Sequence, residues 1–140
     1  MTVSNDQPFV QLAADAEGDA YAVEKAIDCI ETFTVRFNSM DLAGMDALLH
    51  FPHVILSGGK LVAWEGPGQH AATFFDELTM TGWHQTTYRR KQVILATPTK
   101  VHLLVEYSRE NSRGNVLSNH HNLWIVTFDD ERWGIKLRSY

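Results

Sequence analysis

The stretch from Lys100 to Phe128, KVHLLVEYSRENSRGNVLSNHHNLWIVTF, decides the fold. It holds two long runs rich in β-branched and aromatic residues, and the turn-forming segment NSRGN at 111–115 separates them. A similar run lies before this stretch and another after it, and each connection is short. Because strands joined by short connections pair antiparallel, the sequence predicts a four-strand meander at about 84–96, 100–110, 116–128 and 132–140.

Helical periodicity marks the chain before these strands. Apolar residues three or four positions apart follow Asp19, whose carboxylate can cap a helix, and they predict a long first helix. Asp41 is expected to cap a short second helix that ends at Pro52, because proline disfavours helical geometry in the residue before it. The apolar stripe of the first helix consists of Val23, Ile27, Ile30, Phe33, Phe37 and Met40.

Two shorter elements connect the helices to the meander. Residues 53–64, HVILSGGKLVAW, are two β-rich runs around a pair of glycines, which predicts a hairpin. A third helix should follow, with Phe74, Phe75 and Leu78 buried and Gly82 at its end.

Helices followed by long antiparallel strands indicate the α+β class, in which the helices pack on one face of the sheet. Long strands twist and curl, so a sheet of this kind encloses a conical cavity beneath the helices. We expect a flexible N-terminal tail at 1–18 and a single domain at 19–140.

The composition is that of a globular protein, with 44% apolar and 21% charged residues in a chain of 140. Residues 1–50 contain 9 acidic and 2 basic side chains, so this part lacks the basic footprint of a nucleic-acid-binding protein. No run of roughly 18 apolar residues predicts a membrane span, and no signal-peptide pattern opens the chain, so we expect a cytoplasmic protein. Cys29 has no disulfide partner and suits a small core position.

Side chains alternate along a strand, so the residues of 116–128 divide into two sets. We assign the set with the larger apolar groups to the concave side of the sheet. His120, Asn122 and Trp124 then point into the cavity, and His121 points away from it.

The same rule places Trp133, Ile135 and Leu137 of the last strand inside, and Lys136 and Arg138 outside. The outer face is also partly apolar, because Leu104, Leu123 and Ile125 belong to the outward sets. A sheet that is apolar on both faces needs cover on both. We therefore expect a homodimer that forms through the convex face.

The order of these elements resembles the nuclear transport factor 2-like superfamily, which includes SnoaL-like polyketide cyclases, ketosteroid isomerases and scytalone dehydratase. The resemblance covers about residues 19–140 and is closest to an uncharacterised bacterial branch. It implies a cystatin-like cone fold, frequent homodimers and a pocket of small-molecule size. The local motifs that carry it are HFPHV from His50, GWH at Gly82–His84, PTKVHLLV from Pro98 and RWGIKLRS from Arg132.

The characterised enzymes of that superfamily supply residue roles to compare. Ketosteroid isomerases place a base carboxylate on the first hairpin, where the segment 54–57 offers none. Their oxyanion-binding carboxylic acid falls, counting back from Phe128, on Trp124. SnoaL-like cyclases use an acidic base, and the strand carboxylate of Glu106 is expected to face outward. Scytalone-type dehydration relies on histidines and tyrosines, which are present here as residue types.

The candidate substrate-binding residues lie on the expected concave face or beside it. His84 and His120 are also the candidate proton shuttles, because a neutral histidine can accept a proton near neutral pH. The alternative for each is a hydrogen bond to neighbouring side chains or to water at the cavity mouth. The full candidate set is Trp64, His84, Tyr88, His120, Asn122 and Trp124.

No metal site or cofactor is expected. His53, His70, His102 and His121 are scattered without the spacing of a zinc site, and SGGK at 57–60 lies in a hairpin rather than before a helix.

Three functions stay open. The first is a domain that binds a small apolar or aromatic molecule in a largely apolar pocket. The second is a cofactor-independent lyase or isomerase with a pocket histidine as general base. The third is a homodimeric interaction module without catalysis.

Overall fold

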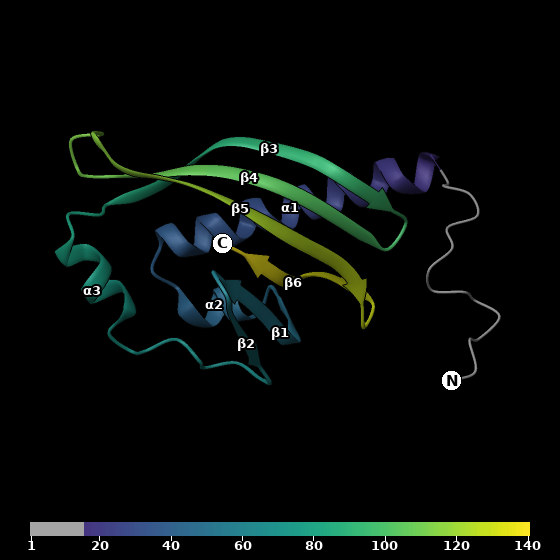
Figure 1. The fold of residues 1–140 in the computed structure, drawn as a ribbon, viewed down its shortest axis with the longest axis horizontal. Helices are drawn as coiled ribbons and strands as arrows, with labels where there is room; N and C mark the ends of the chain where they lie inside the picture. Colours follow the sequence, from purple (N-terminus) through teal and green to yellow (C-terminus); the bar gives the residue numbers. More distant parts are fainter. Residues whose placement is uncertain (1–15) are drawn as a thin grey trace.

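The computed structural model describes residues 16–140, and Figure 1 shows a long helix lying across a strongly curved sheet. The order of elements along the chain is α1 (Ala16–Asn38), α2 (Leu42–Asp46), β1 (Leu49–Ser57), β2 (Lys60–Trp64), α3 (Phe74–Met80), β3 (Gln85–Thr97), β4 (Lys100–Glu110), β5 (Val116–Asp129) and β6 (Arg132–Ser139).

The six strands form one sheet in the order β2-β1-β6-β5-β4-β3. Every neighbouring pair is antiparallel except β1 and β6, which run parallel. The α+β class, the three helices, the hairpin and the four-strand meander are therefore confirmed. None of the described helices is long and apolar enough to cross a bilayer.

The core lies between α1 and the concave face of the sheet. Ala22 and Ala26 are completely buried, because small side chains let the helix approach the strands closely. Further along the helix, Ile30 and Phe33 pack into the same cluster as the inward residues of β4 and β5. The expected alternation of β4 is observed, since its buried apolar residues are Val101, Leu103, Val105 and Tyr107.

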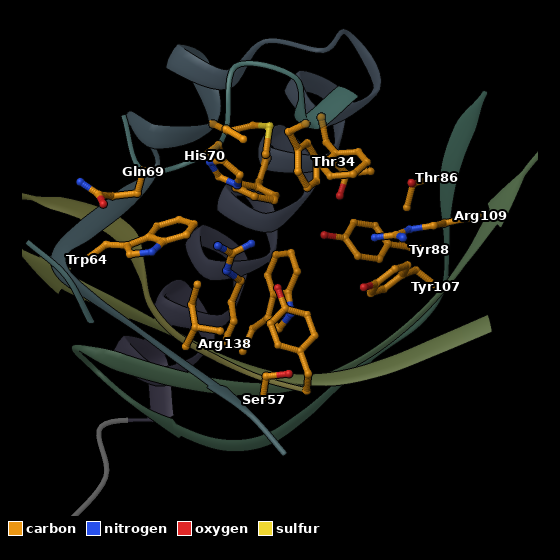
Figure 2. Close-up of a pocket in the computed structure, with 18 residues that line it drawn as sticks. Thr34, Ser57, Trp64, Gln69, His70, Thr86, Tyr88, Tyr107, Arg109 and Arg138 are labelled. Carbon is orange, nitrogen blue, oxygen red and sulfur yellow. The ribbon is translucent and has the colours of Figure 1, made fainter. Parts of the chain in front are cut away.

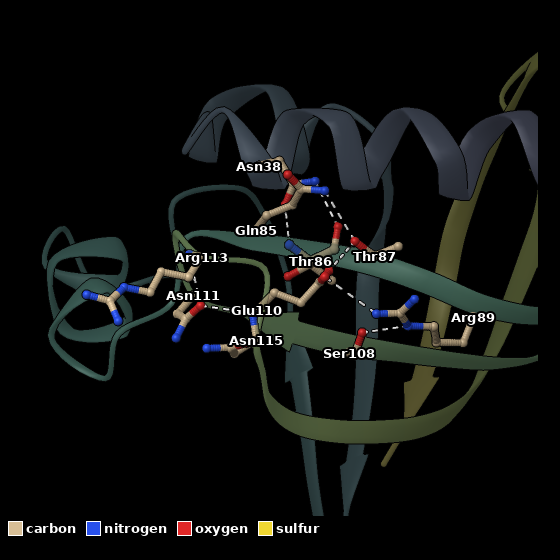
Figure 3. A network of polar contacts seen from close by, with 10 residues as sticks. All are labelled: Asn38, Gln85, Thr86, Thr87, Arg89, Ser108, Glu110, Asn111, Arg113 and Asn115. Carbon is tan, nitrogen blue, oxygen red and sulfur yellow. Dashed lines mark hydrogen bonds and ion pairs between the residues drawn. The ribbon is translucent and has the colours of Figure 1, made fainter.

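The C-terminal end of α1 is fixed to β3 by a pair of reciprocal hydrogen bonds (Figure 3). The Asn38 amide donates to the carbonyl of Thr86 over 2.9 Å, and the backbone N–H of Thr86 donates back to the Asn38 Oδ1 over 2.9 Å. The Thr86 hydroxyl in turn accepts from the indole N–H of Trp83 at 3.0 Å. Neighbouring residues extend the network, as Arg89 donates to the Ser108 hydroxyl and pairs with Glu110.

Two helix boundaries differ from the sequence-based expectation. Helix α1 begins at Ala16, three residues before the expected cap at Asp19, and most of the expected tail at 1–18 lies outside the described residues. Asp41 does cap α2, accepting from the Gly44 N–H at 2.9 Å, but the helix ends at Asp46 rather than near Pro52.

The segment after Asp46 is a strand because its backbone forms hydrogen bonds with β6. The N–H of Ile135 donates to the carbonyl of Leu48 at 2.8 Å, and Leu49 pairs with Ile135 in the parallel ladder. Pro52, which follows a cis peptide bond, therefore lies inside β1. Long-range pairing has overridden a short helical pattern, as tertiary contacts commonly do.

A bulge in β6 reverses the expected orientation of its last residues. Ile125 pairs with Leu137, but the next residue, Val126, pairs with Ile135, which leaves Lys136 without an opposing residue. One extra residue in a strand shifts the alternation of everything beyond it. The expectation that Arg138 faces outward and Leu137 inward is therefore wrong.

Candidate functional site

A cavity of about 500 Å³ lies between the helices and the concave face of the sheet (Figure 2). This volume is in the range of pockets that hold small molecules, about 300–1,000 Å³. Most of its wall is aromatic or aliphatic, with a few polar groups set into it. The aromatic part of the wall includes Phe33, Phe37, Trp64, Phe74, Tyr88 and Trp124.

His70 lines one end of this cavity, and a carboxylate, that of Asp46, lies beside it outside the cavity lining. His70 lies in the loop between β2 and α3, and Asp46 is the last residue of α2. The Nδ1 of His70 is 3.7 Å from the Oδ1 of Asp46, and the two side chains are only 10% and 8% exposed. Neither of these two atoms has another hydrogen-bond partner among the described residues.

The second oxygen of the same carboxylate fixes the loop that carries His70. The backbone N–H of Gly68 donates to the Asp46 Oδ2 at 2.9 Å. Gly68 has φ +84°, a left-handed conformation that glycine adopts without strain and that turns the loop back toward α2. Asp46 therefore both holds the loop and faces the imidazole.

His70 is a neutral base in this environment. Burial lowers its pKa below the ordinary 6.5, the positive charge of Arg138 lowers the pKa further, and the nearby Asp46 opposes both effects. The imidazole also contacts the ring of Trp64, with centroids 4.8 Å apart, and the ring of Phe74 at 5.2 Å. A buried neutral histidine with a carboxylate beside one nitrogen is suited to accept a proton on the other.

Arg138 brings a positive charge into the middle of the cavity. Figure 2 shows its side chain rising from the sheet toward His70 and Trp64. The residue is 5% exposed, and its Nε donates to the Nε2 of His53 at 3.0 Å. The other nitrogen of His53, Nδ1, lies 3.0 Å from the carbonyl oxygen of Ile135 and donates its proton there.

The Arg138 guanidinium has aromatic neighbours but no carboxylate. It lies 5.4 Å from the ring centre of Phe33, 5.8 Å from that of Trp64 and 6.0 Å from that of Trp124. Cation–π contacts of this kind offset part of the free energy of burying a cation. Among the described residues, no acidic side chain forms an ion pair with it.

Two further donors of the cavity wall are unpaired. The indole N–H of Trp124, in a residue 4% exposed, has no acceptor among the described residues, and neither has the buried Nε of Arg109. Buried polar groups are nearly always paired, so each unpaired donor calls for an acceptor.

The sequence-predicted candidates divide into three groups. Trp64, Tyr88 and Trp124 line the cavity. His120 and Asn122 face the concave side but lie behind the wall, where they support Tyr107. Asn122 donates to the Tyr107 hydroxyl at 3.0 Å, and the His120 imidazole stacks on its ring at 5.0 Å.

His84 is placed away from the cavity. It is exposed, precedes β3, and is bound through its backbone N–H to the carbonyl of Glu110. Tyr88, which was expected to share a site with it, instead donates its hydroxyl to the carbonyl of Ile30 at 2.9 Å. A joint acid–base role of these two residues is therefore not supported by the geometry.

The described residues include one group with metal-ligand chemistry at a strand turn. Donor atoms of His50, Asp129 and Asp130 lie within 4.8 Å of one another. The Nε2 of His50, however, lies 3.2 Å from the carbonyl oxygen of Thr127 and 3.1 Å from that of Arg132, which is the geometry of a donated N–H. This arrangement fixes a strand turn.

The opposite effects of Asp46 and Arg138 on the pKa of His70 give a first prediction. The substitution Asp46→Asn removes the interaction that raises the His70 pKa and should lower it, whereas Arg138→Gln removes a lowering interaction and should raise it. Titration of the His70 Cε1–H signal by NMR measures both shifts. A His70 pKa that is unchanged in both variants would show that neither charge acts on this imidazole.

Acid sensitivity gives a second prediction. Burial, followed by the charge of Arg138, lowers the pKa of His53 to about 3. Between pH 6.5 and 3 the unfolded chain therefore binds a proton at His53 that the folded protein does not. As the pH is lowered through this window, the free energy of unfolding should fall by up to about 1.4 kcal/mol per pH unit. His53→Gln, which keeps an acceptor for Arg138, should flatten that slope in urea unfolding, and the exposed-residue control His121→Gln should not.

No family model matches the chain, and no curated protein matches its sequence significantly. Solved structures do match. A protein of unknown function with a cystatin-like fold from Nostoc punctiforme superposes with a TM-score of 0.66 at 11% identity, covering 91% of this chain and 92% of that one. An NTF2-like protein with a cystatin-like fold from Novosphingobium aromaticivorans has a TM-score of 0.66 at 13% identity, covering 86% and 80%.

An enzyme is also among the matches. The hexachlorocyclohexane dehydrochlorinase LinA-type3 from Novosphingobium barchaimii has a TM-score of 0.62 at 13% identity, covering 89% of this chain and 88% of that one. At identities this low, the superpositions establish the fold alone. The resemblance inferred from the sequence motifs is confirmed at that level: the chain has the NTF2-like, cystatin-like fold.

Proposed function

We propose that the cavity is the active site of a cofactor-independent lyase or isomerase, in which His70 removes a proton from a small, largely apolar substrate. The observation that carries the proposal is the buried pair of His70, which lines the cavity, and Asp46 beside it, with nitrogen and oxygen 3.7 Å apart. Sequence reasoning favoured ligand binding and named His84 or His120 as the base. The position of His70 makes it the better candidate for the base, and it favours catalysis over simple ligand binding.

His70 and Asp46 have different roles in the proposed proton transfer. Asp46 faces Nδ1, so it favours the tautomer with the proton on that nitrogen and leaves the Nε2 lone pair free to accept a proton. The separation is longer than a hydrogen bond, and contacts of this kind often shorten only when substrate is bound. Once His70 is protonated, the carboxylate stabilises the imidazolium.

The electron pair left on the substrate has two outcomes. In a lyase it forms a double bond and expels a leaving group from the neighbouring carbon, while the proton stays on His70 until it passes to water. In an isomerase His70 returns the proton to a different carbon. In both, the fixed positive charge of Arg138 stabilises the negative charge that develops in the transition state.

The structural matches support a reaction of this class. The neighbour from Novosphingobium barchaimii is named as a dehydrochlorinase, which shows that this fold accommodates an elimination. The alternative is a binding protein that uses the same cavity without turnover. The Asp46 carboxylate favours catalysis, because one of its oxygens faces the imidazole in addition to the one that holds the loop through Gly68.

Hydrogen exchange at carbon tests the proposal. We expect the protein to accelerate deuterium incorporation at C1 of 2-tetralone in D₂O, followed by NMR, and His70→Asn to reduce the catalysed rate by about 10²–10⁴-fold, the usual contribution of a general base. Asp46→Asn should also reduce it, by a smaller factor.

His84→Asn is the matched control, because that histidine is exposed and outside the cavity. It should exchange 2-tetralone at the wild-type rate. Exchange no faster than in buffer, or catalysis that survives in His70→Asn, would leave the binding alternative in place.

We further propose a homodimer through the convex face of the sheet. All three described helices contribute to the concave side, so no helix within residues 16–140 covers the opposite face. Leu104 pairs there with Leu123, and Ile125 with Leu137, which makes an apolar surface across the central strands. Leu95, on the neighbouring strand, is 42% exposed.

Light scattering after size exclusion tests the dimer. Wild-type protein should elute at twice the chain mass, and Leu123→Arg should elute as a monomer because it places an unpaired charge in the interface. Met80→Arg is the control, since Met80 is 87% exposed on α3 and away from this face. A monomeric wild type, or a dimer that Leu123→Arg does not weaken, contradicts the assignment.

A further inference from the structure

The charge balance inside the cavity points to the chemical class of the substrate. Arg138 is 5% exposed, and its Nε is the guanidinium nitrogen with a partner among the described residues, His53. A buried charge without a counter-charge is strongly destabilising unless other groups compensate it. The three aromatic rings around the guanidinium compensate in part. Within residues 16–140 its hydrogen-bond partner is His53, on Nε, and no acceptor faces Nη1 or Nη2.

The indole of Trp124 supplies an independent observation of the same kind. Its ring centre is 6.0 Å from the Arg138 guanidinium, and its buried N–H is unpaired. Both residues line the same cavity. The guanidinium of Arg138 and the indole N–H of Trp124 therefore lie near one another as hydrogen-bond donors, and the described residues provide no acceptor for the indole N–H.

We propose that the substrate carries a carboxylate, which binds to the Nη1 and Nη2 of Arg138 with the Trp124 indole N–H as an additional donor. This inference rests on the proposed function only in taking the cavity as the substrate site. A guanidinium matches a carboxylate in shape and forms two parallel charge-assisted hydrogen bonds with it. The apolar remainder of the wall suits an aromatic or aliphatic body attached to that group.

The position of Arg138 beside His70 links recognition to chemistry. Figure 2 shows the Arg138 side chain reaching toward His70, so a carboxylate bound to Arg138 places the carbon next to it near the base. A proton on such a carbon becomes more acidic when the carboxylate is neutralised by a cation. The substrate class that fits is therefore an aryl or alkyl carboxylic acid that loses a proton near its carboxylate.

Calorimetric titration with 2-naphthoate and 2-naphthamide tests the inference, since the two probes have the same shape and differ in charge. Wild-type protein should bind the acid about tenfold or more tightly than the amide, because hydrogen bonds between charged groups are the stronger ones. Arg138→Gln should abolish the difference, and Arg138→Lys should retain part of it. Equal affinity for the two probes, or binding of neither, overturns the inference without requiring any variant to fold.

Arg109→Gln is the matched control, because Arg109 also lines the cavity but lies beside Tyr88 and Tyr107, away from His70 (Figure 2). If the preference for the acid depends on Arg109 instead of Arg138, the assignment of the carboxylate site is wrong. His70→Asn separates the two proposals: it should keep the preference for 2-naphthoate and lose tetralone exchange. If the wild-type protein catalyses tetralone exchange but binds 2-naphthoate and 2-naphthamide equally, the substrate class alone is refuted.

Discussion

The parallel pairing of β1 with β6 is the interaction on which the cavity depends. It joins the N-terminal hairpin to the meander, and without it the sheet would lack the side that carries Trp64 and His53. In this register Ile55 pairs with Arg138, so the arginine lies close to the His53 side chain that accepts its Nε–H. A backbone ladder thus sets the position of the cation, and a neutral histidine fixes the direction of its guanidinium.

The polar groups of the cavity act on one another through their charges. Asp46 and Arg138 have opposite effects on His70, and the cation prevails together with burial, so the imidazole stays neutral and ready to accept a proton. The same arginine helps to keep His53 neutral. Burial and one positive charge therefore lower the pKa of two histidines together, and the aromatic rings around the cation limit how far water can weaken its field.

Regular features of the fold were predictable from the sequence. The alternation of β4 and β5 placed the core residues correctly, and the glycine and asparagine turns placed the strand ends within a few residues. The strand face that carries Trp124 was also correct, as was the wall position of Tyr88. These predictions hold because a period of two with one apolar set leaves few other arrangements.

The reacting groups were not predictable for identifiable reasons. His70 lies in a loop and Asp46 at the end of a five-residue helix, and neither position has a periodicity from which a direction can be inferred. The Gly68 hydrogen bond to Asp46 and the packing of His70 on Trp64 and Phe74 hold them together, and these are contacts between segments that only the folded chain brings together. Arg138 was assigned to the wrong face because a bulge leaves no mark in a pattern of alternating residues.

That irregularity at Lys136 also has a meaning for how such cavities change over time. A single inserted codon within a strand turns every later side chain of that strand to the opposite face, so an outward-facing arginine becomes an interior one while its neighbours in the gene stay the same. New chemistry can then arise through a change in length instead of a change of residue. Proteins of this architecture that share a similar terminal segment can thus differ in what their hollow recognises.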